Sequence, residues 1–284
     1  MKVITTSFLV FFCSLFTFAS VSSSERDALV QLYNATNGNQ WTTKWDLSAP
    51  ISSWYGITLQ DDKVIAIHLS ENNLDGFLPN EIQNLVYLQE LDLHKNQLNG
   101  VIPTTIGRLQ SLQKIDISFN QLSGAIPNSI CCLTSLKAIE LYSNAISGEL
   151  PAALGNLTQL ETLALYNNDI QGGLPNSIYK IRTLKNLLLS SNKLNGNLSS
   201  EIINFKSLEN LSLFDNAMQG QVPAEIEQLV NLKEMNISYN NFSGTVSRNL
   251  AALDTLNMTM INNQGSVVLL DIFSEKSKTV VSED

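Results

Sequence analysis

The sequence predicts an α/β solenoid, a right-handed coil with a parallel β-sheet on its concave side and a helical N-terminal cap. Three observations predict it. The pattern L-x-x-L-x-L-x-x-N-x-L-x-G-x-I-P returns every 24 residues without a slip. Its asparagine occurs in eight successive repeats, each followed four residues later by a glycine. The chain of 284 residues is 44% hydrophobic, which suffices for one continuous core.

Four segments follow from this pattern and from the composition around it. Residues 1–22 read as a secretory signal peptide, with Lys2 before an apolar stretch over residues 4–18 and cleavage sites after Ala19 or Ser22. Residues 23–63 form the N-terminal cap, residues 64–250 hold eight repeats, and residues 251–284 hold a degenerate ninth repeat and a tail. No later stretch is long enough to cross a bilayer, so we expect a secreted, extracellular or cell-surface protein.

Each repeat position has a physical role. Leucines and isoleucines alternate with polar residues, as in a strand with one buried face. The asparagine ends the strand, and its amide is expected to satisfy backbone groups of its own and neighbouring coils. A further apolar column is expected to close the back of the core. The asparagines are Asn72, Asn96, Asn120, Asn144, Asn168, Asn192, Asn216 and Asn240, and the column is Ile82, Ile106, Ile130, Leu154, Ile178, Ile202, Ile226 and Leu250.

The two ends depart from the repeat. Residues 24–27 resemble a capping box before a helix that Asn37 and Gly38 end. Three tryptophans follow, at positions 41, 45 and 54, and we expect them to cover the open end of the first coil, with a carbohydrate platform as the alternative. Residues 256–263 resemble a degenerate ninth strand, and the charged residues 275–284 are expected to fray.

The outward residues of the strands form columns on the predicted concave face. The first half of this face is acidic and its middle is aromatic, which predicts a ligand-binding surface for a protein or peptide, with a basic ligand as one option. The expected ligand-binding residues are Asp92, Asp116, Glu140, Phe119, Tyr142, Tyr166 and Phe214. The net charge of −9 and the absence of a basic cluster argue against nucleic acid or an anionic membrane as partner.

The sequence favours a catalytic or metal site less than a ligand-binding surface. The carboxylates of Asp92, Asp116 and Glu140 suggest glycoside hydrolysis, but an open face does not separate their pKa values. His68, Asp92 and His94 have a spacing that allows a metal ion, although solvated histidines are the favoured reading. No nucleophilic triad is present. We therefore expect no enzymatic activity, no cofactor and no metal. The adjacent Cys131 and Cys132 are expected to be small packing residues rather than a disulfide.

The repeat with its L-x-G-x-I-P ending resembles the plant-type leucine-rich repeats of receptor-like kinase ectodomains and polygalacturonase-inhibiting proteins. Residues 27–38 and 54–58 also look like the start of such proteins. Plant caps carry cysteines near the second motif, where this chain has Ser52 and Thr58, as cysteine-free bacterial and algal relatives do. The resemblance implies non-catalytic recognition in signalling, adhesion or inhibition of a cell-wall-degrading enzyme. The alternatives are binding of a cell-surface polysaccharide, or a structural or ice-binding spacer.

Overall fold

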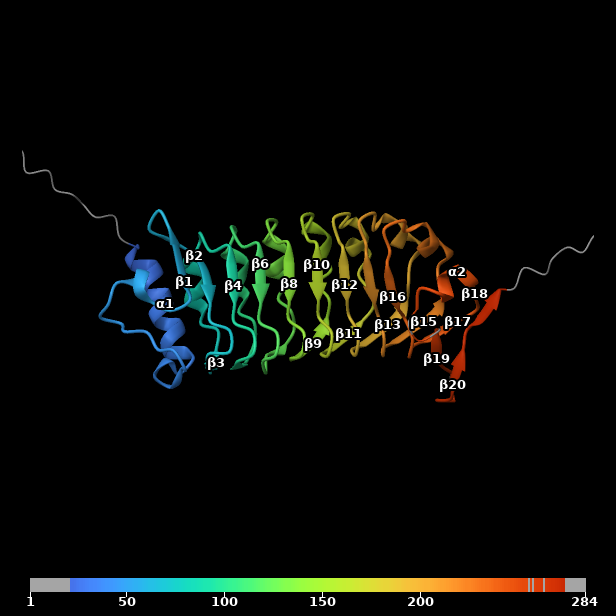
Figure 1. Ribbon diagram of the computed structural model, residues 1–284, viewed down its shortest axis with the longest axis horizontal. Coiled ribbons are helices and arrows are strands. Elements are labelled where there is room, and N and C mark those ends of the chain that lie inside the picture. Colours follow the sequence, from blue (N-terminus) through green and yellow to red (C-terminus); the bar gives the residue numbers. More distant parts are fainter. Residues whose placement is uncertain (1–20, 255, 257, 263, 274–284) are drawn as a thin grey trace, which may run out of the picture.

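One short parallel strand from each coil builds the main sheet of the protein (Figure 1). The computed structural model describes residues 21–254, 256, 258–262 and 264–273. An antiparallel hairpin strand, β1, opens the sheet, and all later neighbours are parallel, which confirms the predicted α/β solenoid. The sheet contains, in spatial order, β1 (Ile57–Gln60), β2 (Lys63–His68), β4 (Glu90–Asp92), β6 (Lys114–Asp116), β8 (Ala138–Glu140), β10 (Thr162–Ala164), β12 (Asn186–Leu188), β14 (Asn210–Ser212) and β16 (Glu234–Asn236).

Shorter strands and 3₁₀ helices complete each coil. A second row of strands follows the asparagine: β3 (Asp75–Phe77), β5 (Gln97–Asn99), β7 (Ser123–Gly124), β9 (Ala145–Glu149), β11 (Asp169–Gly172), β13 (Lys193–Asn197), β15 (Ala217–Gln221) and β17 (Asn241–Ser243). The 3₁₀ helices of the coils are η3 (Asn80–Asn84), η4 (Thr104–Arg108), η5 (Asn128–Cys132), η6 (Leu154–Asn156), η7 (Asn176–Lys180), η8 (Ser200–Asn204) and η9 (Ala224–Gln228). The apolar column expected at the back of the core lies in the 3₁₀ turns, apart from Leu250 in the short helix α2 (Arg248–Ala251), and each of its members is at most 2% exposed.

The register of the main sheet places equivalent residues of neighbouring coils side by side. Leu91 pairs with Ile115, and Asp92 pairs with Asp116, each 24 residues apart. Leu91 and Leu93 are fully buried, whereas Asp92 between them points out of the core. The outward residues of the main-sheet strands and of the turns that follow them therefore form one surface, which we call the sheet face.

An asparagine at the end of each strand, buried or half-buried, joins its coil to the preceding one. In Asn168, Nδ2 donates to the carbonyl oxygens of Leu141 in the preceding coil and Leu165 in its own, both at 3.0 Å. Its Oδ1 accepts from the backbone N–H of Ile146, also in the preceding coil, at 3.0 Å. The equivalent bonds are made by Asn96, Asn120, Asn144, Asn192, Asn216 and Asn240. The amide thus pairs backbone groups that the turn would leave unsatisfied.

The N-terminal cap consists of α1 (Ser23–Ala35), η1 (Gly38–Gln40) and η2 (Ile51–Ser53). Its helix begins earlier than the sequence suggested: Ser22, not Ser24, is the N-cap, and it forms the capping box with Glu25. The Glu25 carboxylate is buried, and it also accepts from the backbone N–H of Val64, which joins the start of the helix to β2.

The three tryptophans of the cap are buried, as the covering role requires. Trp41, Trp45 and Trp54 are at most 4% exposed, and their ring centroids follow one another at 4.9 and 4.7 Å. Each indole N–H donates to a backbone carbonyl. A carbohydrate platform needs exposed ring faces, so that alternative is wrong.

At the C-terminal end the repeat stops in a different way from the one expected. The elements there are β18 (Thr245–Ser247), α2 (Arg248–Ala251), β19 (Thr259–Ile261), β20 (Val267–Leu269) and β21 (Asp271–Phe273). The ninth strand, β19, does not extend the main sheet but pairs antiparallel with β20. Asp254, 3% exposed, accepts the Ile237 backbone N–H and the Ser238 hydroxyl, and so closes the last coil.

Some expectations lie outside the described residues. These are the signal segment up to residue 20, and the frayed tail from residue 274 onward. Among the helices that the structure describes, none is long and apolar enough to cross a membrane. Cys131 is buried, Cys132 is exposed, and both are free thiols.

The asparagine bonds predict a large loss of stability for Asn168→Ala. The substitution leaves the buried N–H of Ile146 without its partner, which costs about 1–3 kcal/mol. It also removes one of the two amide donors to each of the Leu141 and Leu165 carbonyls, which keep their bonds to Asn144 and Asn192. Urea unfolding should therefore show a clearly lower midpoint. The matched control is Asn195→Ala, at an exposed asparagine of the second strand row, and its midpoint should stay near that of the wild type. Equal losses in both variants would contradict this account.

Candidate functional site

Three carboxylates lie side by side on the first half of the sheet face. Asp92, Asp116 and Glu140 occupy the last positions of β4, β6 and β8, and the register pairs each with the next. Adjacent strands lie about 4.8 Å apart, so each carboxylate is the lateral neighbour of the next. The sequence predicted this row correctly, because the 24-residue period fixes which residues become neighbours.

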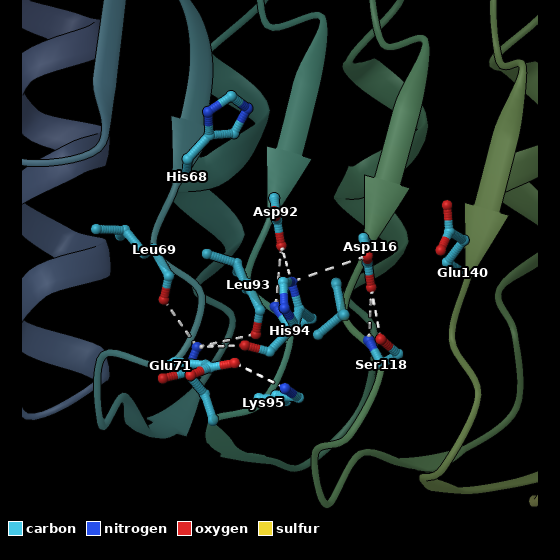
Figure 2. Close-up of polar contacts among 12 residues, drawn as sticks. His68, Leu69, Glu71, Asp92, Leu93, His94, Lys95, Asp116, Ser118 and Glu140 are labelled. Carbon is cyan, nitrogen blue, oxygen red and sulfur yellow. Dashed lines mark hydrogen bonds and ion pairs between the residues drawn. The ribbon is translucent and has the colours of Figure 1, made fainter.

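Asp116 is the most buried of the three, since its side chain is only 8% exposed. Its Oδ1 accepts from the backbone N–H and the hydroxyl of Ser118 at 3.1 and 2.7 Å. The His94 ring lies between the carboxylates, with Nδ1 at 2.7 Å from Asp92 Oδ1 and 3.9 Å from Asp116 Oδ2 (Figure 2). The sequence grouped His68 with Asp92 and His94, but His68 Nε2 lies 3.0 Å from Glu90 Oε2 instead.

Lys114 is a charged member of the site that the sequence reasoning missed. Its Nζ lies 3.5 Å from Glu140 Oε1 and 3.9 Å from Asp116 Oδ2. The signal was available, because Lys114 and Asp116 are two apart on one strand and so share a face. Burial opposes the charge of Lys114, but Glu140 and Asp116 outweigh it and raise the pKa of Lys114. Burial and the Asp116 charge also raise the pKa of Glu140, while Lys114 partly offsets them.

Phe119, Tyr142 and Tyr166 form an aromatic cluster beside the carboxylates. Phe119 meets Tyr142 edge to face at a centroid distance of 5.2 Å. Tyr142 stacks on Tyr166 at 4.3 Å with an angle of 13°. The two tyrosines are half-buried by this stacking, whereas Phe119 is 45% exposed. Burial and the neighbouring Tyr142 raise the pKa of Tyr166 to about 12.

Phe214 does not belong to this cluster, contrary to the expectation. It lies two coils beyond Tyr166, with the coil of Ser190 between them. Its ring instead contacts Tyr239 at a centroid distance of 5.2 Å. The four aromatic residues were expected to lie close together, but the coil of Ser190 has no aromatic residue at the equivalent position and separates Phe214 from Tyr166. Tyr239 was missed as a partner.

Comparison with known protein families returns leucine-rich repeats along most of the chain. A leucine-rich repeat region matches residues 128–275. Two further leucine-rich repeat families match residues 87–146 and 63–85. A protein of Arabidopsis thaliana described as a "probable leucine-rich repeat receptor-like protein kinase" is 39% identical over 90 residues. This match covers 30% of the present chain and 9% of that protein.

Two similar solved structures are plant receptors. The ectodomain of the membrane receptor kinase GASSHO1/SCHENGEN3 from Arabidopsis thaliana, in complex with Casparian strip integrity factor 2, has a TM-score of 0.76 and 27% identity. It matches 88% of this chain and 29% of its own. The plant peptide hormone receptor RGFR1 in complex with RGF2 has a TM-score of 0.64 and 31% identity, over 72% of this chain and 32% of its own. The chain thus spans about a third of the length of these receptor chains.

The contacts of Lys114 predict the direction in which the pKa of Glu140 moves when the cation is removed. In Lys114→Met, burial and Asp116 remain while the lowering effect of the ammonium is lost, so the pKa of Glu140 should rise further. A folded-state pKa above the unfolded value gives a stability contribution that is present at low pH and is lost as the pH rises through the folded pKa. The pH range of that loss should therefore shift upward.

Carboxyl carbon NMR shifts followed through a pH titration measure this change directly. Lys185→Met is the control, because Lys185 pairs with Glu161 in a different part of the chain. The control should leave the Glu140 titration where it is in the wild type. A Glu140 pKa that stays constant or falls in Lys114→Met would contradict the described contacts.

Proposed function

The chain belongs to the leucine-rich repeat family, and from this premise we propose that it is a non-catalytic recognition module that binds a peptide or protein ligand on its sheet face. We propose an extracellular location, secreted or at the cell surface, and a role in signalling, adhesion or inhibition of an enzyme. The similarity to receptor ectodomains solved with their ligands supports this class of function. The observation that carries the proposal is the aromatic cluster on the sheet face.

The aromatic cluster has no part in closing the core. The inward residues of the strands that precede Tyr142 and Tyr166, Ile139 and Leu163, are already buried without it. Its three rings stand on the opposite side of the sheet and retain accessible edges. Aromatic residues held rigidly by one another lose little entropy on binding and dominate the energetics of protein interfaces.

The carboxylates beside the cluster suggest the charge of the ligand. Acidic residues outnumber lysines on this half of the sheet face, although Lys114 neutralises part of the charge. A ligand with basic side chains would gain from this surface, and its affinity would fall as salt screens the interaction. The ionic strength dependence of binding therefore reports on this part of the proposal.

Polysaccharide binding ranks second for a geometric reason. Sugar rings bind aromatic side chains face on, and the stacking of Tyr142 on Tyr166 already covers one face of each ring. A spacer or ice-binding role ranks lower, because the outward column changes from acidic through Ala164 and Leu188 to polar and offers no regular array.

The test compares two double variants in the complete protein. Tyr142→Ala with Tyr166→Ala removes the centre of the cluster, and Tyr55→Ala with Tyr87→Ala removes two exposed tyrosines outside it. Binding is measured against a panel of synthetic peptides, extracellular proteins and insoluble cell-wall glycans. Loss of a hot spot worth about 2 kcal/mol should weaken a peptide or protein ligand about 30-fold in the first variant alone.

Circular dichroism and urea unfolding establish that both variants are folded before binding is compared. An equal loss in both double variants would place recognition elsewhere on the chain. Retention on glycan together with no captured peptide or protein would replace the proposal with the polysaccharide alternative.

A further inference from the structure

Asp92, His94 and Asp116 bring three metal-ligating groups together on the sheet face. One donor atom of each, two carboxylate oxygens and one imidazole nitrogen, lies within 4.8 Å of the others. Asp92 ends β4, His94 follows two residues later, and Asp116 ends the adjacent strand β6. Figure 2 shows the His94 ring lying between the two carboxylates.

The Asp116 carboxylate is held in a position that suits a ligand. Ser118 binds its Oδ1 through both the backbone N–H and the hydroxyl. The other oxygen, Oδ2, has His94 Nδ1 and Lys114 Nζ each at 3.9 Å, beyond hydrogen-bonding distance. A carboxylate more than nine-tenths buried is therefore oriented by one oxygen while the other is directed toward the imidazole. Groups that orient a ligand in this way are typical of metal sites.

The backbone on either side supports the same arrangement. Asp92 Oδ1 accepts from the His94 backbone N–H at 3.2 Å, which holds the histidine close to its own strand. Asp92 and Asp116 face each other through the register of β4 and β6. The three groups are thus positioned by the repeat itself rather than by a flexible loop.

We propose that Asp92, His94 and Asp116 bind one divalent transition-metal ion, with zinc as the best fit, through two carboxylate oxygens and imidazole Nδ1. Zinc takes these ligand types at about 2.0–2.2 Å in tetrahedral geometry, which sets its donors about 3.3–3.6 Å apart. His94 Nδ1 and Asp92 Oδ1, now 2.7 Å apart, therefore have to separate by about half an ångström, and Asp116 Oδ2, now 3.9 Å from Nδ1, has to approach by a similar amount. An imidazole among the ligands favours zinc over calcium or magnesium, which select all-oxygen sites.

The ion would retain coordination positions toward solvent. The side chains of Asp92 and His94 are 23% and 29% exposed, so one side of the group is open. Phe119 of the aromatic cluster directly follows Ser118, so this member of the cluster belongs to the turn that begins next to Asp116. A carboxylate or imidazole of a ligand could bond to the ion on its open side. Metal binding itself does not depend on the proposed function, because it needs only these three side chains.

Lys114 and His68 allow two further tests of the proposed metal site. Lys114 approaches the same Asp116 oxygen that the ion would use, so it competes with the metal, and Lys114→Gln should tighten binding. His68 is the matched control, because it is a sheet-face histidine on the neighbouring strand β2 that pairs with Glu90 outside the group.

The experiment is isothermal titration calorimetry of Zn²⁺ into the complete, tag-free protein after chelator treatment, with no peptide or protein ligand present. The wild type should bind one ion per chain. Loss of a ligand should weaken binding by about tenfold or more in His94→Ala and in Asp92→Asn, whereas His68→Ala should match the wild type. Asp92→Asn serves as the second variant because it changes a less buried carboxylate than Asp116.

Each other outcome overturns the proposal: no heat of binding in the wild type, wild-type affinity in His94→Ala, or an equal loss in His68→Ala. Calcium at the same concentration should not displace Zn²⁺, and displacement would contradict the assignment to a nitrogen-containing site. The double variant Tyr142→Ala with Tyr166→Ala should retain full metal binding. Failure of the metal site and failure of the proposed ligand binding are thereby distinguishable.

Discussion

The hydrogen bonds of one buried or half-buried asparagine per coil are the constraint on which the rest of the structure depends. Each amide binds backbone groups of its own coil and of the preceding coil, so it fixes both the spacing and the register of the stack. A coil of this length cannot bury its apolar face alone. Because the register is fixed, residues 24 apart become lateral neighbours, and the carboxylates and tyrosines of the sheet face owe their proximity to it.

This constraint explains what the sequence could predict. A strict period determines the strand positions, the buried columns and the row that contains Asp92, Asp116 and Glu140, without any knowledge of side-chain conformation. It does not determine which way a side chain turns within its row. His68 turns to Glu90 while His94 turns back to Asp92, and so the group of His68, Asp92 and His94 that the spacing allowed is not formed. Rotamer choice depends on lateral partners, which a single repeat does not encode.

The ends of the solenoid were the least predictable part for a related reason. At the first coil, Asn72 binds the backbone of Thr43 in the cap because no preceding coil exists. At the last coil, the carboxylate of Asp254 accepts a hydrogen bond from the backbone N–H of Ile237. Both solutions use residues that stand outside the period, so the pattern carries no information about them. The shifted helix start at Ser22 and the antiparallel β19 are consequences of the same break in symmetry.

The residue that directly precedes each strand-ending asparagine has an unusual backbone conformation, and this supports a binding role for the aromatic residues at that position. In all eight coils this residue has a φ between 51° and 57° and is not glycine, although glycine or asparagine adopts that conformation at lowest cost. Phe119 and Tyr239 occupy this position, where a bulky residue is strained by roughly 1–3 kcal/mol. Each of them contacts an aromatic residue of a neighbouring coil. The asparagine bonds can hold such a residue in place, but they do not require a ring there. Folding gives no reason for an aromatic residue at these two strained and exposed positions, whereas recognition of a ligand does.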